Sequence, residues 1–90
     1  MFAMGMKKLV EEVEGEGLES LLGQNVMVWC LNYIYSGKLV GVNTGDILLE
    51  DAGVVYETGP LKEEPKDRQE LPSALYVRID KIECYYAHEG

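Results

Sequence analysis

Short segments in which apolar residues alternate between two faces fill most of the chain after residue 25, and this period of two constrains the fold most. Successive side chains of a β-strand point to opposite faces, so such segments predict strands rather than helices. The first segment is apolar on both faces, with Val26, Val28 and Cys30 on one and Met27, Trp29 and Leu31 on the other. We therefore expect this strand to be covered on both sides.

Four more short strands are expected along the rest of the chain, with turn-forming residues between them. They span residues 33–42, 46–51 with a continuation over 54–56, 73–79, and 82–87. Gly37 and Gly41 stand in the second strand, where glycine permits a sharp bend. Residues 43–45 and 80–81 form tight turns. Five short consecutive strands predict a small, strongly bent antiparallel barrel.

Residues 59–72 form the clearest loop of the sequence. The segment contains three prolines and seven charged residues whose charges nearly cancel. A solvated, variable loop is the main expectation, and a partner-binding loop is the alternative.

The first 22 residues predict an arm followed by a helix. Residues 1–6 form a disordered arm in this prediction. Residues 7–22 carry apolar side chains at helical spacing, and Gly23 follows as a C-terminal stop. Gly15 and Gly17 interrupt the pattern, so a start near residue 7 and a start near residue 17 both stay open.

The size and the net charge of the chain limit the classes of partner that we expect it to bind. Its 90 residues predict a single domain over 1–90, with a core thin enough that association with other chains would stabilise it. With 8 basic and 16 acidic residues, the net charge of −8 opposes non-specific binding to nucleic acid or anionic lipid. No apolar run approaches the ~18 residues of a membrane span, so a membrane is not an expected partner.

The reactive residue types are few. Cys30 and Cys84 lie in apolar segments without a pairing motif, so we expect buried free thiols in a reducing, cytoplasmic compartment. A disulfide between them is the alternative if their strands are neighbours. His88 is the single histidine, and the sequence holds no nucleophile–histidine–acid set, phosphate loop or metal-type Cys/His spacing. We therefore expect no enzyme, no metal site and no cofactor.

Four fragments of the sequence carry a family pattern in their order and spacing: LLGQNVMVWCL, GKLVGV, GDILLEDA and YVRIDKIECY. The first resembles the helix exit and first strand of the Sm-like (LSm) family, the next two resemble its first Sm motif, and the last resembles its second Sm motif. The resemblance covers about residues 18–87. It implies a mainly β fold, with an N-terminal helix plus a strongly bent five-stranded antiparallel sheet that forms the Sm-like open barrel.

An open barrel leaves strand edges exposed, which is an aggregation hazard unless the edges are paired. Sm-like proteins pair the fourth strand of one copy with the fifth strand of the next, and such head-to-tail contacts close into a ring. The resemblance therefore implies a homo-oligomeric ring. The expected interface residues are apolar and aromatic side chains of these two strands: Leu75, Tyr76, Val77, Ile79, Ile82, Tyr85 and Tyr86. A purely internal core is the alternative for them.

The resemblance also implies single-stranded RNA as a partner, bound at the ring pore. Asn43 and Asp46 match the polar positions of the turn between strands two and three, Arg78 matches the arginine of the second motif, and Lys81 follows it closely. Thr44 stands where the family has a stacking aromatic residue, and losing that stack removes about 1–3 kcal/mol per base. Asp46 and Arg78 could instead form an ion pair that fixes the turn.

Two functions therefore compete: an RNA-binding ring, and a protein-interaction or assembly ring that does not bind RNA. The acidic charge and the missing aromatic favour the second, and the family resemblance favours the first. Two aromatic features also have two interpretations each. Trp29 is either a core residue or an exposed anchor, and Tyr33 with Tyr35 is either a packing pair or a stacking surface for a ligand.

Overall fold

Six strands and two short 3-10 helices make up the described residues, 17–89, of this computed structural model. The strands are β1 (Asn25–Cys30), β2 (Ile34–Val42), β3 (Asp46–Glu57), β4 (Asp67–Glu70), β5 (Leu75–Arg78) and β6 (Ile82–Ala87). The helices are η1 (Leu18–Leu21), before β1, and η2 (Ile79–Lys81), between β5 and β6. Over residues 17–89, no helix is long and apolar enough to cross a membrane.

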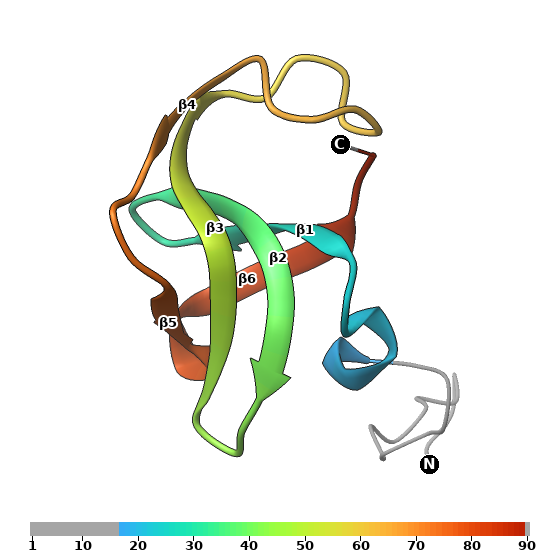
Figure 1. Cartoon of the computed structure of the whole chain (residues 1–90), viewed down its shortest axis with the longest axis vertical. Helices are drawn as coiled ribbons and strands as arrows, with labels where there is room; N and C mark the ends of the chain where they lie inside the picture. The colour runs from blue at the N-terminus through green and yellow to red at the C-terminus, as the bar shows by residue number, and fades with distance from the viewer. Residues whose placement is uncertain (1–16, 90) are drawn as a thin grey trace, which may run out of the picture.

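The strands form one antiparallel sheet that bends strongly on itself (Figure 1). Its order is β4-β3-β2-β1-β6, and β5 also pairs with β3. β3 has 12 residues and serves two partners, because its first half pairs with β5 and its second half with β4. Asp51, with a φ of 51°, lies between the two halves. The bent antiparallel sheet predicted from the sequence is confirmed.

The bend also depends on a close approach between β2 and β3. The register of this pair shifts between Ser36 and Lys38 and again between Leu39 and Gly41. A Cβ atom on Gly37 would lie 2.9 Å from the carbonyl oxygen of Glu50, which is too close for an unshifted backbone. Only glycine fits there, in agreement with the predicted bend.

The main core lies on the inner face of the bent sheet. Its buried members come from β1, β2, β3 and β5: Val26, Val28, Leu39, Ile47, Leu49, Ala52 and Val77. Burying each larger aliphatic side chain of this kind stabilises the fold by about 1.5–3 kcal/mol. Four strands therefore depend on one another through a single apolar cluster.

On the outer face of the sheet, β1 is buried and the side chain of Arg68 reaches from β4 across β3 to β2. Met27 of β1 is fully buried on this face, so the first strand is covered on both sides as predicted. Arg68 Nε donates to Ser36 Oγ (2.8 Å), and its Nη2 donates to the carbonyl oxygens of Ser36 (3.3 Å) and Asp51 (2.7 Å). The guanidinium lies against Gly53, where a Cβ would be 2.6 Å from Arg68 Cζ. These three bonds fasten β4 to the sheet.

The hairpin between β3 and β4 also meets the C-terminal segment of the chain (Figure 1). Glu89 N donates to the carbonyl oxygen of Lys62 (2.8 Å), and His88 N donates to that of Asn25 (3.0 Å). Pro65 of the hairpin is buried. This end of the sheet is thus closed by its own chain.

The predicted N-terminal helix is wrong over the residues that the structure describes. Residues 7–16 of the prediction, and the predicted arm over 1–6, lie outside those residues. The remainder holds only η1, a 3-10 turn of four residues with no buried side chain. Gly17, with a φ of 81°, interrupts helical backbone directly before it.

Two further predictions need correction. The sheet has six strands rather than five, because the predicted loop over 59–72 contains β4. Neither cysteine is fully buried as predicted: Cys84 is exposed, since it lies on the edge strand β6, and Cys30 is half-buried. Both cysteines are free thiols, so the disulfide alternative does not hold.

Candidate functional site: the open edge of the sheet

The sheet does not close, and its two unpaired edges lie close together in the chain. Among the described strands, β5 pairs only with β3, and β6 pairs only with β1. The two strands are joined by the three residues of η2, yet they do not pair with each other. A strand with one neighbour presents a row of backbone N–H and C=O groups on its other side.

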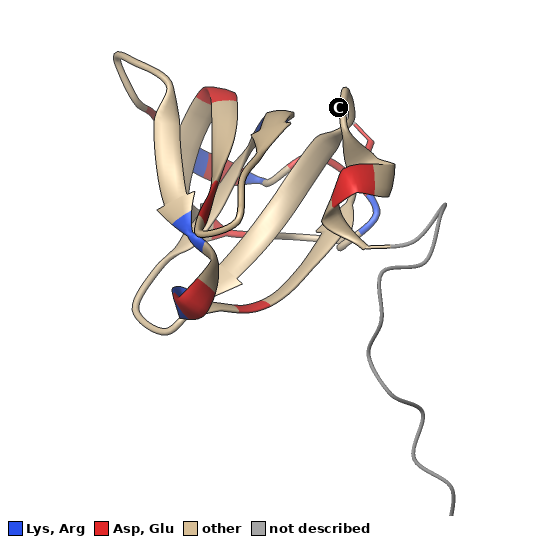
Figure 2. Cartoon of the chain, turned by 90° about the horizontal axis from the view of Figure 1, so that it is seen from below, with Lys and Arg blue, Asp and Glu red and all other residues tan. Residues whose placement is uncertain are grey.

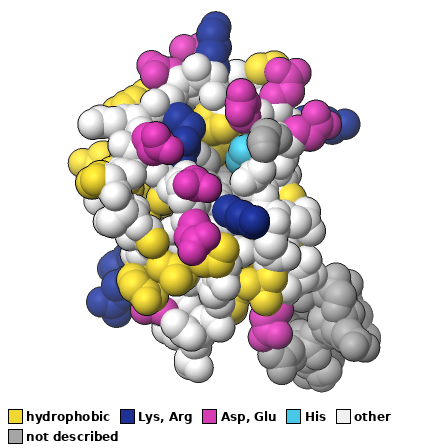
Figure 3. Space-filling view, in the orientation of Figure 1, with side chains coloured by type: hydrophobic (Ala, Val, Ile, Leu, Met, Phe, Trp, Pro, Cys, Tyr) yellow, Lys and Arg dark blue, Asp and Glu magenta, His cyan; other side chains and the backbone are white. Residues whose placement is uncertain are grey.

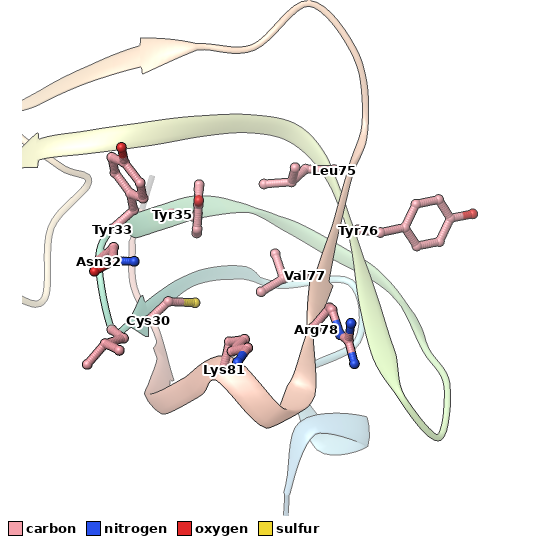
Figure 4. A pocket seen from close by; sticks show the side chains of 10 residues that line it. Cys30, Asn32, Tyr33, Tyr35, Leu75, Tyr76, Val77, Arg78 and Lys81 are labelled. Carbon is pink, nitrogen blue, oxygen red and sulfur yellow. The ribbon is translucent and has the colours of Figure 1, made fainter.

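A pocket of about 330 Å³ opens beside these edges. It is bounded by the end of β1, the β1–β2 turn, the start of β2, β5 and η2 (Figure 4). Its lining residues are Cys30, Leu31, Asn32, Tyr33, Tyr35, Leu75, Tyr76, Val77, Arg78 and Lys81. The volume falls within the range of about 300–1,000 Å³ that is typical of binding pockets.

The floor of the pocket is apolar, and its polar groups lie at the margin. Leu75 and Val77 point into it from β5, and Cys30 and Tyr35 point toward them from the other wall (Figure 4). The ring of Tyr76 extends to the opposite side of β5 (Figure 4). In Figure 3, hydrophobic side chains gather at the left edge of the molecule, on the side where β5 lies in Figure 1. The pocket therefore opens within an apolar surface.

Two titratable groups of the pocket wall, Cys30 and Tyr35, have raised pKa values. Burial raises the pKa of the Cys30 thiol, and the nearby charge of Glu83 raises it further. Burial also raises the pKa of Tyr35, with smaller contributions from Cys30 and Tyr33. A thiol with a raised pKa is a poor nucleophile at neutral pH. The floor suits apolar contact better than covalent chemistry.

The predicted RNA-binding residues lie next to this pocket, at the rim formed by the β2–β3 turn and η2. Asp46 and Arg78 are register partners across β3 and β5. Ile79 N donates to the carbonyl oxygen of Gly45 (3.0 Å), which ties the two segments together. The structure thus brings Asp46 and Arg78 together, and Lys81 lines the pocket with Arg78.

The side chains of the rim are engaged with one another. Asn43 Nδ2 donates to Asp46 Oδ1 (2.9 Å), and Asn43 N donates to the backbone oxygen of Asp46 (2.8 Å). Arg78 Nη2 pairs with Asp80 Oδ2 at 3.4 Å. The ion pair suggested for Asp46 and Arg78 is therefore replaced by two local contacts, since each side chain has a nearer partner along its own chain segment.

Positive charge is scattered over the described residues. In the view of Figure 2, the basic positions stand among acidic ones and do not form a continuous basic face. At the rim, the two cations Arg78 and Lys81 are balanced by Asp46 and Asp80. The rim offers polar contacts but little net attraction for phosphate groups.

Comparison with known proteins gives the same fold by an independent route. No protein-family model matches the sequence, and no curated protein matches it. Among solved structures, the chain is similar to a heptameric archaeal Sm protein, with a TM-score of 0.61 and 18% sequence identity over 78% of this chain and 93% of that one. The fold is Sm-like. The family resemblance carried by the sequence fragments is confirmed at the level of the fold.

Within this Sm-like fold, the seven predicted interface residues divide by depth. Val77 is buried in the subunit's own core, and Leu75, Ile79 and Ile82 pack against that core while remaining partly accessible. Tyr86 is half-buried, and its hydroxyl accepts a hydrogen bond from Trp29 Nε1 (3.2 Å). The two residues with large exposed areas are Tyr76, which is 62% exposed, and Tyr85, which is 36% exposed.

Two features of this Sm-like fold are not evident from the sequence. Arg68, which fastens β4, is one of seven charged residues in the segment predicted as a loop, and its sequence context does not distinguish it from the others. The sequence predicts either a packing pair or a stacking surface for Tyr33 and Tyr35, and nothing in it connects Cys30 or Tyr33 with β5. The rings of the two tyrosines lie 6.2 Å apart and are tilted by 42°. Over residues 17–89, no group of three or more His, Cys, Asp or Glu side chains is placed to hold a metal ion.

Proposed function

We propose that this Sm-like chain is a non-enzymatic subunit that assembles with identical copies into a closed ring. The β5 edge of one copy pairs with the β6 edge of the next. The observation that carries the proposal is the presence of two strand edges, each with one neighbour, in one small subunit. A head-to-tail contact uses a different surface on each partner, so repeating it leads either to a ring or to an open filament.

The side chains near the edges support assembly. Leu31, Tyr76 and Tyr85 are 76%, 62% and 36% exposed, and all three lie on β5, β6 or the adjoining β1–β2 turn. Aromatic residues are enriched at protein interfaces, where charged residues are depleted. The similar solved structure is heptameric, which favours a ring over a filament.

Sedimentation velocity on a matched pair of variants tests this function. Tyr76→Asp places a charge beside the β5 edge and should shift the particle toward the monomer mass of 10.1 kDa. Tyr56→Asp is the control, because Tyr56 is equally exposed at 62% but lies on the covered end of β3. A wild-type chain that sediments as a monomer at micromolar concentration would remove the proposal.

A second candidate function is the binding of single-stranded RNA at the rim. The observation that favours it is the hydrogen bond from Ile79 to Gly45, which joins the two segments that the resemblance assigns to RNA. The rim then offers Asn43, Asp46, Arg78 and Lys81 to a nucleotide. Because the chain carries a net charge of −8, we expect weak binding that is steeply sensitive to salt.

Fluorescence anisotropy with U-rich and A-rich oligoribonucleotides, at low and moderate salt, tests this candidate. Arg78→Ala should abolish binding, whereas Lys66→Ala should not, because Lys66 lies in the distant β3–β4 hairpin and pairs with Glu57. Absence of binding even at low salt would leave the assembly ring as the function.

A further inference from the structure

We propose that Tyr85 of one subunit inserts into the pocket of the neighbouring subunit and fills it. The inference rests on the proposed ring, and it names the side chain that makes the contact. It also gives the pocket an occupant, which is a second copy of this chain.

The direction of Tyr85 follows from the register of the sheet. Tyr85 pairs with Val28, and side chains of directly paired residues lie on the same face. Val28 is a buried member of the main core, so Tyr85 projects from the inner face of β6. It is nevertheless 36% exposed, because β6 is an edge strand with no neighbour on its far side.

The floor of the pocket lies on the matching face of the opposite edge. Leu75 and Val77 pair with Leu49 and Ile47 of β3, and both partners are buried in the core. When a strand is added to a sheet, inner-face residues of the new strand lie beside inner-face residues of the old one. A β6 strand added to the β5 edge would therefore carry Tyr85 toward Leu75 and Val77.

The other aromatic residue of β6 is already engaged. Tyr86 pairs with Met27 on the outer face and accepts a hydrogen bond from Trp29 (3.2 Å). Turning β6 over to present Tyr86 to the pocket would break this bond. The inner-face orientation leaves it intact.

The pocket also matches a tyrosine side chain in size and in polarity. An apolar cavity of about 150 Å³ binds benzene, so a pocket of about 330 Å³ has room for a phenol ring. The ring would lie on the apolar floor, and its hydroxyl would reach the polar margin, where Asn32, Arg78 and Lys81 stand. A buried tyrosine hydroxyl usually needs such a partner.

The charges of the two edges are complementary. The pocket margin carries Arg78 and Lys81, and β6 carries exposed Glu83 two residues before Tyr85. A head-to-tail contact brings the acid of one copy toward Lys81 of the next, whereas Arg78 already pairs with Asp80 of its own chain. Contact between two copies of the same edge would instead place like charges together.

Cys30 provides a built-in reporter for this contact, because its thiol lines the pocket and Cys84 lies on the outer face. In a Cys84→Ser background, Cys30 is the single thiol of the chain. Its rate of alkylation by a maleimide, followed by intact-mass spectrometry, measures access to the pocket. The mass of the particle is measured in parallel by light scattering.

We expect Tyr85→Ser to raise the alkylation rate by about tenfold or more, since the reactivity of a covered group follows the fraction of time it is open. The same variant should lower the particle mass. Tyr85→Phe should keep both properties, because it retains the ring. Leu61→Ser, at an exposed leucine of the β3–β4 hairpin, which bonds to Glu89 beyond the C-terminal end of β6, should change neither.

The outcomes separate the two proposals. If the Cys84→Ser parent is a ring and Tyr85→Ser leaves both its mass and the Cys30 rate unchanged, the insertion is wrong and the ring stands. If the parent is a monomer, the ring fails and the insertion with it. Should Tyr85→Ser lose its circular dichroism spectrum, Leu75→Trp decides instead, since a tryptophan that fills the pocket from within must exclude the neighbour and give monomers. A Leu75→Trp ring would overturn the insertion.

Discussion

The two ends of this bent sheet differ in how their strand edges are covered. At the hairpin end, β4 covers the second half of β3, Arg68 fastens it with three hydrogen bonds, and the C-terminal segment bonds to the hairpin. At the other end, β5 and β6 each keep an unpaired edge beside an open apolar pocket. The first end is covered by its own chain. The second end has unpaired strand edges and an apolar pocket, which are the features that a second copy would cover.

The comparison indicates that the stability of the fold and the assembly of copies depend on different parts of this small domain. A domain of this size buries only a small apolar core. Apolar side chains that stay exposed at an open edge therefore lose a substantial share of the stabilisation that burial would give. Substitutions at the covered end should change the free energy of unfolding, and substitutions at the open edge should change the particle mass. The following predictions use this separation.

The largest effect is expected in the core shared by both ends. Leu49→Ala should lower the free energy of unfolding by about 2–5 kcal/mol, because Leu49 is fully buried and its removal leaves a cavity. Leu61→Ala is the control, at an exposed leucine of the hairpin, and should change stability by less than about 0.5 kcal/mol. Urea denaturation measures both, and equal shifts would contradict the assignment of the core.

An intermediate effect is expected at the fastening of β4. Arg68→Met should destabilise the fold by about 1–3 kcal/mol, because it leaves the carbonyl oxygen of Asp51 and the groups of Ser36 without their donor. Arg78→Met removes the same charge from an exposed pair with Asp80, and should cost less than about 1 kcal/mol. If thermal unfolding shifts equally for both variants, the covered end is not held by Arg68.

The smallest effect is expected at the thiol of the pocket. Because burial and then Glu83 raise the pKa of Cys30, its alkylation should begin at higher pH in the folded chain than in urea. Because the pKa of Cys30 is higher in the folded state, its neutral thiol contributes fully to stability at a pH below the pKa of the unfolded chain. That contribution is lost as the pH rises through the pKa of the folded chain.

Glu83→Gln removes the second cause of that raised pKa and should move the alkylation profile of Cys30 part of the way down in pH. Glu63→Gln, at an exposed acid of the β3–β4 hairpin, is the matched control and should leave the profile in place. The profile is best measured in the Cys84→Ser background by mass spectrometry. A profile unchanged between the folded chain and the urea-unfolded chain would show that the pocket does not shield the thiol.

Much of the sheet could be predicted from the sequence, because its strands carry alternating apolar residues. β1, β2, β3, β5 and β6 all lie where the period of two placed strands. β4 could not be predicted this way, since Asp67–Glu70 contains no apolar residue and is held by its backbone pairing with β3 and by hydrogen bonds of Arg68. The 3-10 turn η1 differs from the predicted helix because glycine precedes it with a positive φ.

The candidate site could be predicted only where it follows motifs that are continuous in sequence. The two motifs placed Asp46 and Arg78 together, and the register confirms that they are neighbours. The pocket joins the β1–β2 turn to β5, more than 40 residues later in the chain. No local pattern reports a contact of that separation, because it depends on how strongly the sheet bends.

The most direct test of edge pairing between copies is residue-resolved hydrogen–deuterium exchange of the backbone amides in β5 and β6. β1 is the internal reference, because it has a neighbour on each side, β2 and β6. If copies pair edge to edge, successive amides of β5 and of β6 should all be protected, as in β1. Protection of alternate amides only, with those on the free edges exchanging as fast as in exposed loops, would contradict it.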